Sequence, residues 1–144
     1  MTLSILIVDD NATDRYLLKR RLQRIDLDLK LLEAENGAVA LEIFADYQNQ
    51  RDADPETHPP LLVFLDINMP IMDGFGFLSA LHHVTAVPDH PSPRVVMFTS
   101  SGRQEDKERS LHWDFVQEYI VKGELTAQKL EDMLRGPQDT LDCA

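Results

Sequence analysis

The chain of 144 residues contains a single cysteine, Cys143, which is its penultimate residue. One cysteine cannot form an intrachain disulfide, and it cannot supply the several thiolates of a cysteine-based zinc site. The sequence also lacks an apolar run of about 18 residues and a charged-then-apolar leader segment. We therefore expect a cytoplasmic protein without a membrane-spanning helix.

Basic residues are scarce relative to acidic ones. The chain has 14 Lys and Arg against 25 Asp and Glu, which gives a net charge of -11. This charge opposes nonspecific attraction to a nucleic-acid backbone or to an anionic membrane surface. We expect no nucleic-acid partner and no membrane partner, whereas a basic protein or a bound cation would suit the charge.

Apolar residues make up 43% of the chain and charged residues 27%, a balance typical of folded globular proteins. A chain of this length has enough residues to bury a core as one domain. We expect that domain to cover residues 1–136, with a short tail over 137–144 after the stop signal at Gly136 and Pro137.

Short apolar runs that end in polar or charged residues recur along the chain. The four clear runs are ILIVDD at 5–10, LLVFLD at 61–66, VVMFTSS at 95–101 and YIVK at 119–122. A weaker fifth run is LKLLEA at 29–34. None of them alternates between apolar and polar residues. Continuous apolar runs of this length are typical of parallel strands that are covered on both faces by helices.

Segments with helical spacing of apolar residues lie between these runs, and Asn11 can cap the first of them. The predicted helices cover 12–25, 38–47, 75–84, 103–113 and 126–135, and the polar segments 48–60 and 85–93 predict surface loops. Strands that alternate with helices predict an α/β fold, namely a three-layer, doubly wound, five-stranded parallel sheet flanked by five helices.

Polar side chains follow most of the predicted strands. Because the carboxyl ends of parallel strands share one edge of a sheet, these residues should meet there: Asp9, Asp10, Asp66, Thr99, Ser100 and Lys122. Three neighbouring carboxylates repel one another, and a divalent metal such as Mg²⁺ would relieve that repulsion. An oxygen-only acidic cluster beside a lysine and a hydroxyl is suited to handling a phosphoryl group.

The four clear motifs, in this order and on these strands, resemble the receiver domain of bacterial two-component response regulators over about residues 3–135. The resemblance implies a flavodoxin-like sheet of the receiver type. It also implies that Asp66 accepts a phosphoryl group from the phosphohistidine of a sensor histidine kinase or a phosphotransfer protein. Such a protein is a phosphoacceptor in signalling rather than an enzyme with an external substrate.

The resemblance further assigns roles to individual residues. Mg²⁺ or Mn²⁺ would be held by Asp9, Asp10, Asp66 and the main-chain carbonyl of Asn68, while Thr99, Ser100 and Lys122 would bind the phosphoryl group. On phosphorylation Thr99 would move toward the phosphoryl group and Tyr119 would rotate inward. The changed surface, at about residues 103–135, would then bind an unknown downstream protein.

Several of these residues also allow a purely structural interpretation. Thr99 and the two serines after it could simply cap a helix, and Tyr119 could be a half-buried edge aromatic. Trp113 and Phe115 are compatible with a homodimer through the 103–135 face, but they could equally belong to the core.

Three classes of function are compatible with the motifs. The leading one is a single-domain receiver, because the short tail cannot form an output domain. The second is an aspartyl phosphohydrolase. Such an enzyme needs an acid two residues after the nucleophile to protonate the leaving group, and this chain has Asn68 there. The third is a receiver-like module that binds partners without phosphorylation. Gly123 alone favours it, because the family normally has a proline there, joined to the lysine by a cis peptide bond; we expect a trans bond here.

Overall fold

The computed structural model describes residues 2–85 and 93–135 and contains one sheet of five parallel strands in the order β2-β1-β3-β4-β5. Strands and helices alternate along the chain: β1 Leu3–Val8, α1 Ala12–Gln23, β2 Leu29–Ala34, α2 Gly37–Ala53, β3 Leu62–Leu65, α3 Gly74–Val84, β4 Arg94–Thr99, α4 Gln104–Leu111, β5 Val116–Val121 and α5 Ala127–Arg135. The predicted α/β fold is therefore confirmed.

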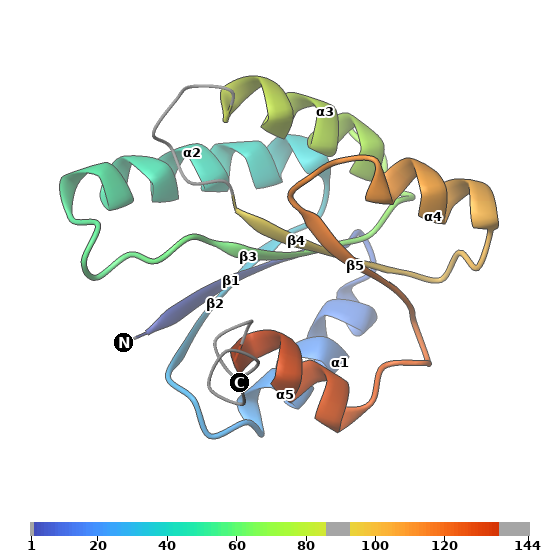
Figure 1. Ribbon diagram of the computed structural model, residues 1–144, viewed down its shortest axis with the longest axis horizontal. Helices are drawn as coiled ribbons and strands as arrows, with labels where there is room; N and C mark the ends of the chain where they lie inside the picture. Colours follow the sequence, from blue (N-terminus) through green and yellow to red (C-terminus); the bar gives the residue numbers. More distant parts are fainter. Residues whose placement is uncertain (1, 86–92, 136–144) are drawn as a thin grey trace, which may run out of the picture.

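Helices cover both faces of the sheet. Figure 1 shows α2, α3 and α4 above it and α1 and α5 below it. Successive residues of β1 point to opposite faces, so that Leu6 and Val8 join the core cluster under α2 and α3 while Ile5 and Ile7 join the cluster against α1 and α5. Because both faces are buried, nearly all residues of the central strands are apolar, which explains the absence of alternation.

The register of the central strands places the site. Val8 pairs with Leu65 between β1 and β3, and the amide of Asp66 donates to the carbonyl of Val8 at 3.0 Å. Asp9 and Asp66 are the next residues on these neighbouring strands. The sheet therefore ends with two carboxylates side by side.

Two predicted boundaries were wrong by three residues or more. The predicted loop at 48–60 is helical up to Ala53, because its Gln and Arg residues favour helices despite their polarity. Gln50 even bonds to Asp46 one turn earlier, Nε2 to Oδ2 at 3.2 Å. The last strand begins at Val116 rather than at residue 119, because β5 is an edge strand and tolerates an exposed Gln117.

Other predictions fall beyond the described residues. Of the predicted loop at 85–93, residues 86–92 are not described, and neither are Gly136, Pro137 or the tail at 137–144. In the described part of the chain, no helix has both the length and the apolar character needed to cross a membrane.

Helix α1 begins where the sequence predicts. Asn11 is its N-cap, and its Oδ1 accepts a hydrogen bond from the amide of Asp14 at 3.0 Å. The cap lies directly after the two acids that end β1, so α1 starts at the carboxyl edge of the sheet. This geometry places the first turn of α1, including Asp14, beside the predicted site.

Candidate functional site

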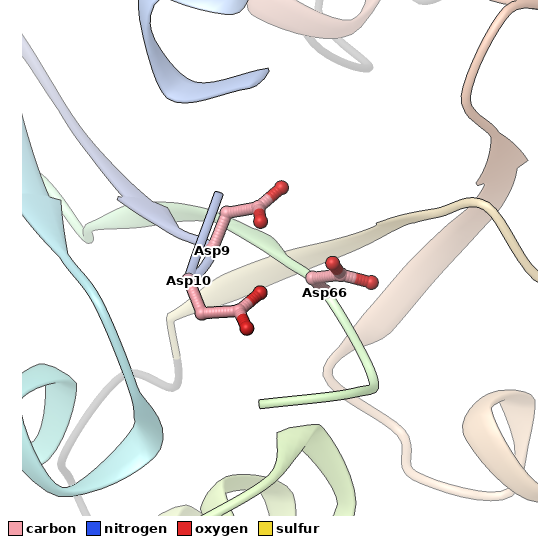
Figure 2. Close-up of side chains that lie close together, drawn as sticks. All are labelled: Asp9, Asp10 and Asp66. Atoms are coloured by element: carbon pink, nitrogen blue, oxygen red, sulfur yellow. The ribbon is translucent and has the colours of Figure 1, made fainter. Parts of the chain in front are cut away.

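Three carboxylates meet at the carboxyl edge of the sheet. Asp9 and Asp10 follow β1, Asp66 follows β3, and one oxygen of each lies within 4.8 Å of the others. Figure 2 shows the three side chains gathered at the strand ends. Asp9 and Asp66 are buried, at 3% and 6% exposure, while Asp10 is exposed. The arrangement is thus open to solvent on one side and enclosed on the other.

Lys122 lies against this cluster. Its Nζ lies 2.6 Å from Asp9 Oδ2, 2.8 Å from Asp14 Oδ2 and 3.1 Å from Asp66 Oδ2. An ammonium has three donors, and these three carboxylates can take one each. The predicted convergence of Asp9, Asp66 and Lys122 is therefore present, and Asp14 joins it.

A tight turn holds Lys122 in this position. The amide of Glu124 donates to the carbonyl of Val121 at 3.0 Å, and Gly123 has a φ of +94°. A hydrogen-bonded turn with positive φ at its third residue favours glycine there. The peptide bond between Lys122 and Gly123 is trans, as expected, and the amide of Lys122 also donates to the carbonyl of Thr99 at 2.6 Å.

The buried charges perturb one another. Burial, together with the charge of Asp66, raises the pKa of Asp9 against the opposing hydrogen bonds from Lys122 and the Asn11 amide. Burial by itself would lower the pKa of Lys122, but hydrogen bonds to Asp14 and Asp9 and the charge of Asp66 raise it above its usual range. Lys122 is therefore held as an ammonium.

The backbone after β3 fixes the carboxylate of Asp66. Its Oδ1 accepts a hydrogen bond from the amide of Ile67 at 2.7 Å, while Oδ2 faces Lys122. Gly74 comes so close that a Cβ placed on it would lie 2.3 Å from the carbonyl oxygen of Asp66. In the same loop Ile71 has a φ of +70°, and its side chain is 87% exposed. The loop is thus tightly constrained where it supports Asp66.

The remaining predicted phosphoryl-binding residues surround this edge. Thr99 ends β4, is fully buried, and accepts a hydrogen bond at Oγ1 from the amide of Ser101 at 3.3 Å. Ser100 and Asn68 are exposed and line an open cavity of about 420 Å³ between the loops that follow β3 and β4. Asn68 and Ser100 therefore face a shared solvent space beside the carboxylates.

Tyr119, the predicted switch aromatic, is half-buried on β5 and packs against the core cluster under α2 and α3. Its hydroxyl donates to the carbonyl of Ser101 at 2.8 Å, and burial raises its pKa. Ser101 Oγ in turn donates to Asp106 Oδ2 at 2.5 Å. The ring thus links β5 to the loop between β4 and α4.

Asp14 was not predicted from the sequence. It lies in the first turn of α1, where an acid is favourable for any helix, so its type and position carried no separate signal. Only the fold brings it 2.8 Å from Lys122, across 108 residues of sequence.

Trp113 and Phe115 pack against the core cluster and stack on each other with ring centroids 6.0 Å apart. Their core role, one of the two alternatives, is thus visible in the structure. The homodimer stays a prediction.

The donor set suits a hard divalent cation. All three clustered side chains offer carboxylate oxygens, which Mg²⁺ and Mn²⁺ prefer, and the exposed side of the cluster leaves room for water or phosphate ligands. A cation there would also offset the burial and the repulsion from Asp66 that raise the pKa of Asp9. Chemically, the site offers a buried carboxylate, a cation-binding cluster and a fixed ammonium.

The chain resembles known proteins over most of its length. The sequence model of the family described as "Response regulator receiver domain" matches residues 5–135. The chain is 35% identical to chemotaxis protein CheY of Bacillus subtilis (strain 168) over 100 residues, which cover 69% of either chain. It is 31% identical over 140 residues to the probable transcriptional regulator ycf27 of Porphyridium aerugineum, covering 97% of this chain and 50% of that protein.

The chain thus spans about half the length of the ycf27 relatives it matches. Among solved structures, it resembles the Mn(2+)-bound form of response regulator Rcp1, with a TM-score of 0.66 and 25% identity, over 95% of this chain and 92% of that one.

Proposed function

The chain belongs to the family of response regulator receiver domains, and we propose that it is a phosphorylation switch whose phosphoacceptor is Asp66. Receiver domains act in two-component signalling and are not enzymes in the usual sense. One observation carries the proposal for Asp66: the Lys122 ammonium lies 3.1 Å from this buried carboxylate, beside the acidic pair that ends β1. Asp9 shares this burial and this contact, at 2.6 Å, so the choice of Asp66 rests also on the resemblance of the motif over residues 61–74 to the phosphoacceptor motif of the family.

In the proposed reaction an oxygen of Asp66 attacks phosphorus, and the bond between phosphorus and a phosphohistidine nitrogen breaks. The donor would be a sensor histidine kinase or a phosphotransfer protein. The Ile67 amide, 2.7 Å from Asp66 Oδ1, restricts rotation of the carboxylate and so keeps it oriented for attack. Because transfer needs mainly positioning and charge neutralisation, such a fixed carboxylate suits it.

Asp9, Asp10 and Asp66 would hold Mg²⁺ or Mn²⁺, with the main-chain carbonyl of Asn68 as a further ligand. A bound divalent cation would neutralise charge on the transferring phosphoryl oxygens. The clustering of three carboxylate oxygens within 4.8 Å supports this assignment, because such a cluster is otherwise self-repelling.

Lys122, Thr99 and Ser100 would bind the phosphoryl oxygens. The turn at Gly123 keeps the ammonium of Lys122 over Asp66, so it can pair with an oxygen of the new phosphoryl group. Thr99 would donate its hydroxyl, and Ser100, exposed in the cavity beside Asn68, can do so from the open side.

The proposed switch joins this site to a protein-binding face at about residues 103–135, which includes α4, β5 and α5. A hydrogen bond from Thr99 to the phosphoryl group exists only in the phosphorylated state, so it is a contact that can shift the equilibrium. The bond from Tyr119 to Ser101 supports a coupling between β5 and the loop that follows Thr99. The partner would be a downstream protein, and the similarity to chemotaxis protein CheY, over equal shares of both chains, supports a single-domain role.

The test is intact-mass measurement after incubation with acetyl phosphate, with and without Mg²⁺. The wild type should gain one phosphoryl group only when Mg²⁺ is present, and Asp66→Asn, which keeps the shape of the side chain, should gain none. Lys122→Met should slow the gain, because it removes the ammonium and keeps the length of the side chain.

An adduct that forms equally on Asp66→Asn would refute the assignment of Asp66. If the wild type gains no phosphoryl group and also fails to bind beryllium fluoride with Mg²⁺, the phosphorylation switch is refuted and a module that binds partners without phosphorylation becomes the leading hypothesis.

A further inference from the structure

Lys122 contacts more carboxylates than the proposed reaction uses. Asp9 and Asp66 belong to the acidic cluster, but Asp14 does not, and its Oδ2 lies 2.8 Å from the ammonium. This contact is as close as the one to Asp66, at 3.1 Å. A phosphoryl group on Asp66 would therefore meet an ammonium that already has another acceptor.

Asp14 is held in place independently of the lysine. It occupies the first turn of α1, and its backbone amide is fixed by the side chain of Asn11 at 3.0 Å. Its side chain is 34% exposed, whereas those of Asp9 and Asp66 are 5% and 8% exposed. The carboxylate thus approaches Lys122 from the solvent side of the site, on a rigid helix.

The contacts of Asp9 and Asp66 with Lys122 would weaken once a cation and a phosphoryl group are bound at the site. Asp9 and Asp66 would turn an oxygen to the cation, and Asp66 would also carry the phosphoryl group. Asp14 is not one of the clustered carboxylates that would hold the cation, so its contact with Lys122 would stay. It therefore remains as a carboxylate that holds one of the three donors of Lys122 and orients the ammonium toward α1.

We propose that Asp14 is a positioning residue that draws the ammonium of Lys122 toward α1 and so weakens its pairing with a phosphoryl group on Asp66. The inference rests on the proposed function and deepens it. Asp14 adds negative charge near an incoming anion, so it disfavours the phosphoryl group, while the same charge favours a divalent cation. Removing this charge should change the two affinities in opposite directions.

The opposite signs separate this role from a structural one. As an acid in the first turn of α1, Asp14 also stabilises the helix through its dipole, and loss of that effect alone would lower stability without improving any binding. A loosened site would bind both the cation and the anion less tightly. Loss of a negative charge near the site instead gives weaker cation binding together with stronger anion binding, and the Asp73→Asn control separates contact with Lys122 from charge alone.

The experiment compares the wild type with Asp14→Asn and Asp14→Glu by titration calorimetry, first with Mg²⁺ alone and then with beryllium fluoride at saturating Mg²⁺. Beryllium fluoride stands in for the phosphoryl group on a carboxylate. Asp14→Asn should bind beryllium fluoride about fivefold more tightly and Mg²⁺ several-fold more weakly, the size expected for one partly exposed unit charge at close range. Asp14→Glu keeps the charge within reach of Lys122 and should stay near the wild type.

Asp73→Asn is the matched charge control. Asp73 caps α3 through a bond from the Gly76 amide at 2.8 Å, and asparagine caps equally well. This substitution removes one negative charge from the same edge of the sheet without touching Lys122, so its effect on both affinities should be smaller. Thermal unfolding of every variant reports any loss of structure.

Beryllium fluoride binding that is unchanged or weaker in Asp14→Asn, with normal binding by the wild type, would overturn this inference and leave the proposed function standing. An Asp73→Asn effect as large as that of Asp14→Asn would also overturn it, because mere charge would then suffice. A wild type that binds no beryllium fluoride would overturn the proposed function and this inference with it.

Discussion

The backbone at Gly123 gives a stability prediction whose size can be worked out. Gly123 has a φ of +94°, and a Cβ placed on it would meet no atom within 4 Å. An alanine there is therefore strained only by its backbone conformation, which costs about 1–2 kcal/mol. The loss of chain entropy in the unfolded state offsets about 0.4–1 kcal/mol of that. Gly123→Ala should lower the free energy of unfolding by about 1 kcal/mol.

For a domain of this size a loss of 1 kcal/mol lowers the melting temperature by about 2–4 °C. The assay is thermal unfolding followed by circular dichroism, with urea unfolding as a second measure of the same free energy. Gly123→Asn should lose less than the alanine variant, because asparagine tolerates positive φ better. Gly123→Pro should lose the most, since proline fixes φ near −65° and cannot adopt this turn.

Gly102 is the matched control for this prediction. A Cβ on it would also meet no atom within 4 Å, but Gly102 does not have the positive φ of Gly123. Gly102→Ala should therefore leave stability unchanged or raise it by up to about 1 kcal/mol. If both alanine variants shift the melting temperature by the same amount and in the same direction, the turn at Gly123 does not depend on glycine and the reasoning fails.

Three further predictions concern the same edge of the sheet. Gly74→Ala should destabilise by about 3 kcal/mol or more in urea unfolding, since its Cβ would lie 2.3 Å from the Asp66 carbonyl oxygen; a loss below 1 kcal/mol would contradict this contact. Ile71→Asn should raise the melting temperature by about 2–4 °C, because asparagine relieves the strain of the φ of +70°, and a lower value would argue against strain. Burial raises the pKa of Asp9 above 3.8, so its ionised form opposes folding; Asp9→Asn should raise the melting temperature at about pH 7, and the gain should shrink as the pH falls toward 3.8. A gain that is independent of pH would refute the last of these.

The positions of the strands along the chain and the approximate site followed from the sequence for a physical reason. Strands buried on both faces are largely apolar, and in the continuous apolar run of β3 the charged Asp66 marks the end of the strand within one residue. Edge elements follow weaker rules. Gln117 on β5 faces solvent, and the polar end of α2 at 48–53 has no apolar face to reveal its helical period. Those boundaries therefore depended on the tertiary structure.

The distances within the site depended on the tertiary structure even more than the boundaries of the edge elements did. The pattern of residues placed Lys122 and Asp66 at one edge, but the 3.1 Å contact needs both the register of β1 with β3 and the turn after β5. The turn could be anticipated in part, since Gly123 allows a trans bond and a positive φ. Asp14 could not be anticipated, because an acid in a first helical turn has a sufficient local explanation.

Unfavourable features of this chain concentrate at the carboxyl edge of its sheet. Asp9 is ionised against its burial, Ile71 adopts a strained φ, and Gly74 and Gly123 occupy conformations or spaces closed to other residues. Strain of this kind persists only where the surrounding structure determines it, and the fully buried strands β1 and β3 do so here. A binding event that gives Asp9 a cation partner would remove the first of these penalties. The stability of the unbound domain and its affinity for ligands at this edge are therefore opposed, and substitutions that raise the first should lower the second.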